Sequence, residues 1–187
     1  KMSDENTSFE DALKEAQDLG LAEKDPTMDV DGTDAAQKAS ILSALAFNTP
    51  FDFTSVTYGG IESITQEDIL YAEELGYSIK HIAYGSIKDM EANISAYPTF
   101  VPNGQLLSQV GQQMNALEVH CEGMGSTVYY GPGAGPKPTA SAVIADLVDI
   151  SKGGWPKSKQ SGKKNKLSTK GNQEFSRYFK LDVKNEA

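Results

Sequence analysis

The chain has 187 residues, of which 39% are hydrophobic and 23% are charged, as in a folded domain with a single hydrophobic core. It contains no apolar run near the ~20 residues that a membrane-spanning helix needs, and its polar, acidic start differs from a secretory signal. The net charge of −9 argues against nucleic acid as the main partner.

Charge is divided unevenly along the chain. Residues 1–150 hold 7 Lys and Arg against 23 Asp and Glu, whereas residues 151–187 hold 10 against 3. The basic end is rich in Gly, Ser and Lys, which favours a flexible linker over a nucleic-acid-binding segment. We therefore expect one domain over 1–150, then a basic linker and the start of a possible C-terminal regulatory domain over 151–187. In that last part, residues 178–183 alternate apolar and polar side chains, as a strand does.

Two helices are expected in the first 50 residues. Ser8 with Asp11 three positions later predicts an N-cap, apolar residues then recur at helical spacing, and Gly20 ends the helix. After an acidic loop, a second helix rich in Ala and Leu is expected from about 34 to 47. A short strand is expected around residues 51–56.

The remaining pattern predicts strands with two more helices. A capping box that starts at Thr65 predicts a helix over 65–75, and two strands are expected between 77 and 102. A hairpin that turns near 122–123 and a helix over 138–150 follow. Because the order lacks regular βαβ alternation, it favours an α+β fold, with helices packed on one face of a mixed or antiparallel sheet.

Cysteine and histidine give no sign of a metal site. The single cysteine, Cys121, excludes an internal disulfide and fits a reducing, cytoplasmic location. His81 and His120 lie in separate segments without zinc-ligand spacing, so we expect both at surface or strand positions and expect no bound metal.

The densest polar cluster lies in the acidic loop and the helix that follows it. Its members are Glu23, Asp25, Asp29, Asp31, Asp34 and Lys38. Asp34 and Lys38 are four positions apart and therefore share a helix face. A lysine among carboxylates can move a proton to or from a substrate oxygen, and spare carboxylates can hold a substrate ammonium group.

Plainer interpretations of this cluster remain open on spacing alone. Acids before a helix often only cap it, and an Asp–Lys pair at this spacing is usually a solvated ion pair. A calcium loop is not expected, because the twelfth position counted from Asp29 is Ser40 and not the Glu of an EF-hand.

A glycine-rich segment, GPGAGPKPTAS, precedes the last predicted helix. Its glycines would allow close backbone approach, and a helix N-terminus offers free N–H groups to a ligand. The segment matches neither a Walker A motif nor the G-x-G-x-x-G dinucleotide fingerprint. A simple turn from strand to helix is therefore an equally open interpretation.

Three segments together resemble the homoserine dehydrogenase family over roughly residues 8–151. The first meets every fixed position of F-x-x-x-L-x-x-A-x-x-x-G-x-x-E-x-D-P-x-x-D-x-x-G-x-D-x-x-x-K, from Phe9 to Lys38. The second is GIESITQEDILYAEELGYSIK, and the third combines NA with YGPGAGPKPTASAVIAD. Such a long set of matched positions is specific to the family.

The resemblance implies NAD- or NADP-dependent interconversion of L-aspartate 4-semialdehyde and L-homoserine, in threonine and methionine biosynthesis. It implies that Lys38, aided by Asp29, handles the proton on the substrate oxygen. It further implies that Glu23, Asp29 and Asp34 bind the amino-acid substrate.

The resemblance also implies partners. Gly133, Gly135 and Thr139 are expected near the cofactor, and a homodimer is expected to form through the sheet. The family's nucleotide-binding domain, which sets the choice between NAD and NADP, is missing from this sequence. We therefore expect the isolated chain to be an inactive substrate-binding and dimerisation part of the enzyme. The alternative is an isolated, non-catalytic dimerisation module.

Overall fold

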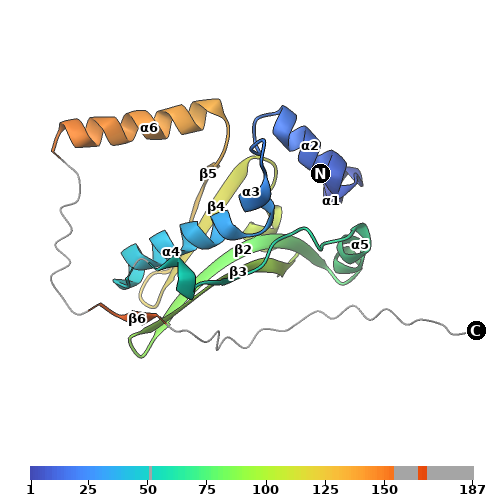
Figure 1. Cartoon of the computed structure of the whole chain (residues 1–187). Helices are drawn as coiled ribbons and strands as arrows, with labels where there is room; N and C mark the ends of the chain where they lie inside the picture. The colour runs from blue at the N-terminus through green and yellow to red at the C-terminus, as the bar shows by residue number, and fades with distance from the viewer. Residues whose placement is uncertain (51, 154–163, 168–187) are drawn as a thin grey trace, which may run out of the picture.

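The fold is α+β, as the sequence predicts (Figure 1). The computed structural model describes residues 1–50, 52–153 and 164–167. Its helices are α1 Met2–Glu5, α2 Phe9–Asp18, α3 Thr27–Val30, α4 Thr33–Phe47, α5 Gln66–Glu74 and α6 Pro136–Ser151, with 3-10 turns η1 Phe53–Ser55 and η2 Leu106–Gln109. Its strands are β1 Thr57–Tyr58, β2 Tyr77–Lys88, β3 Glu91–Pro102, β4 Met114–Cys121, β5 Gly125–Pro132 and β6 Lys166–Leu167.

The main sheet is mixed and has β3 at its centre. Strand β2 pairs with β3 in antiparallel register, from Tyr77 opposite Pro102 to Lys88 opposite Glu91. Strands β1 and β6 both run parallel to β3, while β4 and β5 form a separate two-stranded antiparallel sheet. The two strands predicted between 77 and 102 and the hairpin predicted to turn near 122–123 are therefore confirmed, and the hairpin stands apart from the main sheet.

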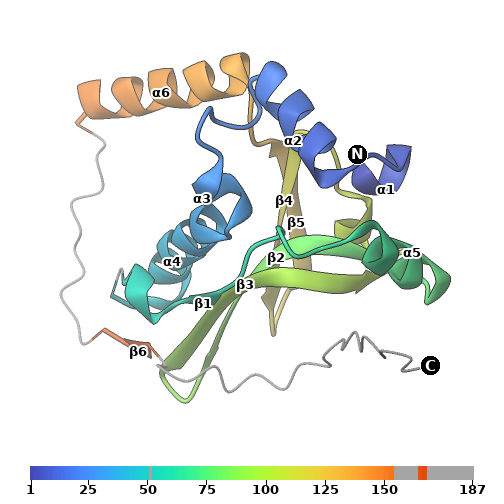
Figure 2. The ribbon, with the colours of Figure 1, turned by 45° about the vertical axis from the view of Figure 1, so that its right-hand side comes forward.

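Helix α4 covers one face of the β2–β3 pair, and small side chains let it approach closely (Figures 1 and 2). The core cluster consists of Ala36, Ala39, Val56, Ile94 and Ala96. Opposite the helix, a Cβ added at Gly85 of β2 would lie only 2.7 Å from Ser43 Oγ. Larger residues at these positions would force the helix off the sheet.

Side-chain caps predicted from the sequence fix two helix starts. Ser8 Oγ accepts a hydrogen bond of 3.1 Å from the Asp11 N–H at the start of α2. Thr65 and Asp68 form a reciprocal capping box at the start of α5, where Asp68 accepts from the Thr65 N–H at 2.8 Å. Each cap satisfies N–H groups that a helix cannot satisfy internally.

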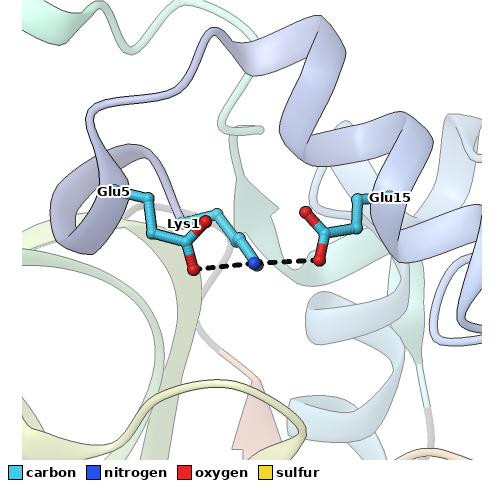
Figure 3. A network of polar contacts seen from close by, with 3 residues as sticks. All are labelled: Lys1, Glu5 and Glu15. Carbon is cyan, nitrogen blue, oxygen red and sulfur yellow. Dashed lines mark hydrogen bonds and ion pairs between the residues drawn. The ribbon is translucent and has the colours of Figure 1, made fainter.

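A network of exposed charges joins α1 to α2 (Figure 3). Lys1 Nζ lies 2.7 Å from Glu5 Oε1 and 2.9 Å from Glu15 Oε1. The hydrogen bonds to Glu15 and Glu5 raise the pKa of Lys1, and the Lys1 ammonium lowers the pKa of the Glu5 carboxyl. Because the groups are exposed, solvent screens this network and its tether is weak.

Residues 164–167 return to the sheet from within the segment expected to be a linker. Asn165 donates its backbone N–H to Asn48 O at 3.0 Å and its side-chain amide to Phe47 O at 2.6 Å. Leu167 packs against the core cluster, and β6 pairs with the start of β3. These contacts satisfy carbonyls at the C-terminal end of α4 that would otherwise lack helical partners.

Local side-chain bonds explain where the secondary structure differs from prediction. Residues 53–55 form a 3-10 turn and not the expected strand, because Asp52 Oδ1 accepts hydrogen bonds from Thr54 N and Oγ1 at 3.0 and 2.6 Å. The acidic loop contains a short helix, α3, which the sequence pattern does not predict. Helix α6 begins two residues earlier than predicted, with Pro136 in its first turn.

Two further sequence predictions concern the strand expected near the C-terminus and the lack of a membrane-spanning helix. The alternating residues 178–183 lie outside the described residues. Within the described part, no helix has the length and apolar character that crossing a bilayer requires.

Candidate active site

Helix α2 fixes the loop that begins the acidic cluster. Gln17 Nε2 donates hydrogen bonds to the backbone oxygens of Glu23 and Lys24, at 3.0 and 3.3 Å. Gly20 adopts a φ of +67°, which lets the chain reverse after the helix. The position of Glu23 therefore depends on α2 as well as on its own loop.

The second half of the loop folds into α3 and brings Asp29 back to Glu23. Asp29 Oδ2 accepts a hydrogen bond of 3.1 Å from the Glu23 N–H. This bond joins two residues that the sequence predicts in the same site, and it uses only one of the two Asp29 oxygens. The other oxygen is available to a ligand.

A small cleft of about 190 Å³ opens at this point. It is lined by Glu23, Asp25, Thr27, Met28, Asp29 and Asp34. The structure thus places Glu23, Asp29 and Asp34, three of the residues in the predicted polar cluster, around one concavity. Thr27 and Met28 were not predicted, because they belong to α3, which the sequence pattern did not reveal.

Lys38 lies beside this cleft and is not among its lining residues. Its Nζ is 2.6 Å from Asp34 Oδ2, one helical turn away on α4. The side chains of Lys38 and Asp34 are 58% and 43% exposed, so solvent screens the pair and both remain free to exchange partners. The amine therefore contacts Asp34, one of the acids that line the cleft, without lining the cleft itself.

Asp25 is held in its ionised form by Thr27. Asp25 Oδ1 accepts a hydrogen bond of 2.7 Å from the Thr27 hydroxyl and one of 3.2 Å from the Thr27 N–H. The hydroxyl first, and then the backbone N–H, lower the pKa of the Asp25 carboxyl. The lowered pKa keeps Asp25, on the wall of the cleft, ionised to a lower pH than an ordinary aspartate.

Asp31 plays the structural part that the plainer interpretation allowed. Its Oδ1 accepts a hydrogen bond of 2.8 Å from the Thr33 N–H, at the first turn of α4. It does not line the cleft. Gly32, between them, adopts a φ of +90°, which a residue with a Cβ would adopt only under strain. This turn aims Asp34 and Lys38 from the start of the helix.

The arrangement suits a small ligand with a positively charged end. Four carboxylates surround the cleft, so an ammonium group would be attracted and a carboxylate would be repelled. Met28, 47% exposed, adds an apolar surface that methylene groups can contact. Among the described residues, no group of three or more His, Cys, Asp or Glu is arranged to hold a metal ion.

The second predicted site is a tight turn from β5 into α6. The Gly133 N–H donates to Gln113 O at 2.9 Å, and a Cβ on Gly133 would collide with the Asn115 side chain. Gly135 has a φ of +106°, and the Thr139 hydroxyl donates to Gly135 O at 2.8 Å. The turn itself therefore explains why Gly133, Gly135 and Thr139 occur at these positions.

The two predicted sites lie at the same end of the molecule. In both views, the end of α2, where the acidic loop begins, and the start of α6 are at the top (Figures 1 and 2). Helix α6 is drawn above α4 and apart from the α4–sheet layer in both views, and none of its residues is buried. A ligand or domain at this end would meet both segments.

Comparison with known proteins gives one consistent result. A family model described as homoserine dehydrogenase matches residues 1–148. The chain is 46% identical over 152 residues to a homoserine dehydrogenase of Neisseria gonorrhoeae, covering 81% of this chain and 35% of that protein. It is 45% identical over 152 residues to one of Bacillus subtilis, covering 81% and 35%.

Solved structures agree. A homoserine dehydrogenase from Thiobacillus denitrificans has a TM-score of 0.75 at 43% identity, covering 92% of this chain and 39% of that chain. The S. aureus homoserine dehydrogenase at pH 6.5 has a TM-score of 0.74 at 43% identity, covering 81% and 38%. The chain thus spans about a third of the length of the curated relatives, which places most of those proteins outside this comparison.

Proposed function

The chain belongs to the homoserine dehydrogenase family, and from this premise we propose that its acidic cleft binds the amino-acid substrate of such an enzyme. The reaction is the NAD- or NADP-dependent interconversion of L-aspartate 4-semialdehyde and L-homoserine. One observation carries the proposal: the acids Glu23, Asp29 and Asp34 line one cleft, with the amine of Lys38 2.6 Å from Asp34.

We propose a role for each of the three acids and for Lys38. Glu23 and Asp34 hold the substrate ammonium, and the free oxygen of Asp29 is the third acceptor. When the substrate binds, Lys38 exchanges its contact with Asp34 for the substrate's side-chain oxygen. There it donates a proton as the aldehyde is reduced, or accepts one as the alcohol is oxidised. The cofactor supplies or takes up the hydride.

The turn before α6 is proposed to face the cofactor. Thr139 already donates its hydroxyl to Gly135 O, so its contribution would come from backbone N–H groups and from the close approach that Gly133 and Gly135 permit. The sequence contains no G-x-G-x-x-G fingerprint. Most of the cofactor site would therefore be provided by residues outside this chain, and the isolated chain should not turn over.

A homodimer formed through the sheet is part of the proposal. Its support is an apolar groove of about 240 Å³ beside the β4–β5 hairpin, lined by Leu106, Gln109, Val110, Ala116, Val128 and Tyr130. Tyr129 and Tyr130 are more than 60% exposed. Sedimentation of the chain should show a dimer, and a monomer at high concentration would contradict this part.

Location in the cytoplasm is also part of the proposal. Its support is that the single cysteine, Cys121, is free.

The decisive test measures NAD(P)H formation with L-homoserine as substrate. The full-length gene product that contains these residues should oxidise homoserine, whereas the 187-residue chain alone should not. Robust turnover by the chain alone would refute the division of labour proposed here. If the full-length product forms dimers but has no turnover, the alternative of a non-catalytic dimerisation module would be favoured.

A further inference from the structure

A short backbone strap connects the sheet to the turn that aims the acidic cleft. The strap, residues 59–61, follows β1 and lies against residues 30–32. Its Ile61 N–H donates to Val30 O at 2.8 Å, and its Gly59 N–H donates to Ala96 O of β3 at 2.9 Å. The strap is thus fixed to the sheet on one side and to the loop after Asp29 on the other.

Contact between the strap and the turn is made by backbone atoms. A Cβ added at Gly60 would lie 2.2 Å from Val30 O and 2.6 Å from the Cα of Asp31. A Cβ added at Gly32 would lie 2.7 Å from Gly59 O. With no side chains between them to absorb movement, a shift of the strap would shift the turn by a similar distance.

His81 controls the carbonyl at the centre of this contact. Its Nε2 lies 2.9 Å from Gly59 O, and because a carbonyl oxygen only accepts, Nε2 must carry the hydrogen. The ring is half-buried on β2, opposite Pro98 of β3. Gly59 O is therefore placed between the imidazole of His81 and the backbone of Gly32, which is the N-cap of α4.

We propose that His81 is a positioning residue for the acidic cleft. By donating a hydrogen bond to Gly59 O, it fixes the position of the strap. The strap in turn fixes the turn where α3 ends and α4 begins. Asp29 lies just before that turn, and Asp34 and Lys38 lie just after it. His81 does not line the cleft and acts only through this backbone path. The inference rests on the proposed function for its kinetic consequence.

The test compares three variants in the full-length gene product. His81→Phe keeps a ring but removes the donor, His81→Gln keeps an N–H near the same position, and His120→Phe is the matched control on the exposed β4. His81→Phe should raise the KM for homoserine about fivefold to twentyfold, as expected for a lost hydrogen bond that positions binding groups, and should also lower kcat, because the same turn positions Lys38. The KM for the cofactor should not change, and His81→Gln should restore most of the homoserine KM.

A second measurement does not depend on turnover. Amide hydrogen exchange of peptides that cover 59–61 should be faster in His81→Phe than in wild type or His120→Phe. Unchanged exchange and KM in His81→Phe would overturn the proposal, as would a defect that His81→Gln fails to correct. If wild type shows no turnover, the proposed function fails, and exchange at Ile61 alone then supports or overturns the role of His81.

Discussion

Two regions of this molecule differ in how far they bury their apolar side chains. In the body, made of α4 and strands β1 to β3, Ala36 and Ala96 are fully buried. In the arm, made of the β4–β5 hairpin and α6, Val143 and Leu147 are 54% and 56% exposed. A soluble helix normally buries one apolar stripe. The core cluster therefore lies in the body, although α4 also leaves Ile41, Leu42 and Leu45 exposed, whereas no residue of α6 is buried.

The largest expected effect separates chemistry from packing within the body. Lys38→Ala in the full-length gene product should lower kcat about 10²–10⁴-fold, because the proton on the substrate oxygen loses its partner. The free energy of unfolding should change by less than about 0.5 kcal/mol, since the side chain is exposed. Steady-state kinetics and urea unfolding measure the two quantities.

Lys24→Ala is the control, because it removes an exposed lysine from the neighbouring acidic loop and leaves the Lys38–Asp34 pair on α4 unchanged. Its turnover should match wild type. If Lys38→Ala also retained wild-type turnover, Lys38 would have no part in the reaction. The distinction between catalytic and packing residues within the body would then lose its main support.

Two glycines in strands sharpen the contrast in packing. Gly85→Val should lower the free energy of unfolding by about 1–3 kcal/mol, because its Cβ would crowd Ser43 Oγ and the Phe47 ring. Gly131→Val in the arm meets open space and should change stability by less than about 0.5 kcal/mol. Urea unfolding of both variants provides the test, and equal losses would show that the arm is packed as tightly as the body.

Leu147→Ala tests whether the exposed face of α6 is covered in a larger protein. In the 187-residue chain, the change should alter the free energy of unfolding by less than about 0.5 kcal/mol, because Leu147 is 56% exposed. In the full-length gene product, it should cost about 2–5 kcal/mol if a further domain covers that face. Thermal and urea unfolding of both forms, side by side, make the measurement. A small effect in both forms would indicate that α6 stays uncovered.

The smallest effect concerns the charge of the cleft wall. Thr27→Ala should raise the pKa of the Asp25 carboxyl towards its ordinary value, whereas Thr27→Ser should keep it low because the hydroxyl remains. A lowered carboxyl pKa stabilises the folded state above the ordinary Asp pKa, and this contribution is lost as the pH falls through the lowered value. NMR titration of the Asp25 carboxyl measures the shift. If the pKa of Asp25 were unchanged in Thr27→Ala, its lowering would have a cause other than the Thr27 hydroxyl.

Prediction from sequence succeeded where the signal is local. Ser8 and Thr65 mark helix starts because a hydroxyl three residues before an N–H caps it in almost any context. The acids Glu23, Asp29 and Asp34 could be predicted as one cluster because they lie close together in the sequence before and at the start of the helix that carries Lys38. These inferences need only the spacing of neighbouring residues.

Prediction from sequence failed where a structure depends on contacts between distant segments, or on a turn that a side-chain hydrogen bond stabilises. Asp52 imposes a turn on residues that favour a strand, and its effect depends on hydroxyl geometry that spacing does not encode. The sequence pattern does not reveal the strap or the bond from His81, because both depend on contacts between segments about 20 to 40 residues apart. His81 had been expected at a surface or strand position, and it does lie in a strand.

The bond from Asn165 to Phe47 joins positions 118 residues apart in the sequence. Closing so long a loop has a large entropy cost that local helices and hairpins do not bear. The contact should therefore form late, after α4 and the β2–β3 pair already exist to receive it. On heating or proteolysis, the same contact should be the first to open, while α4 and the β2–β3 pair are still folded, so its loss would mark the earliest step of unfolding.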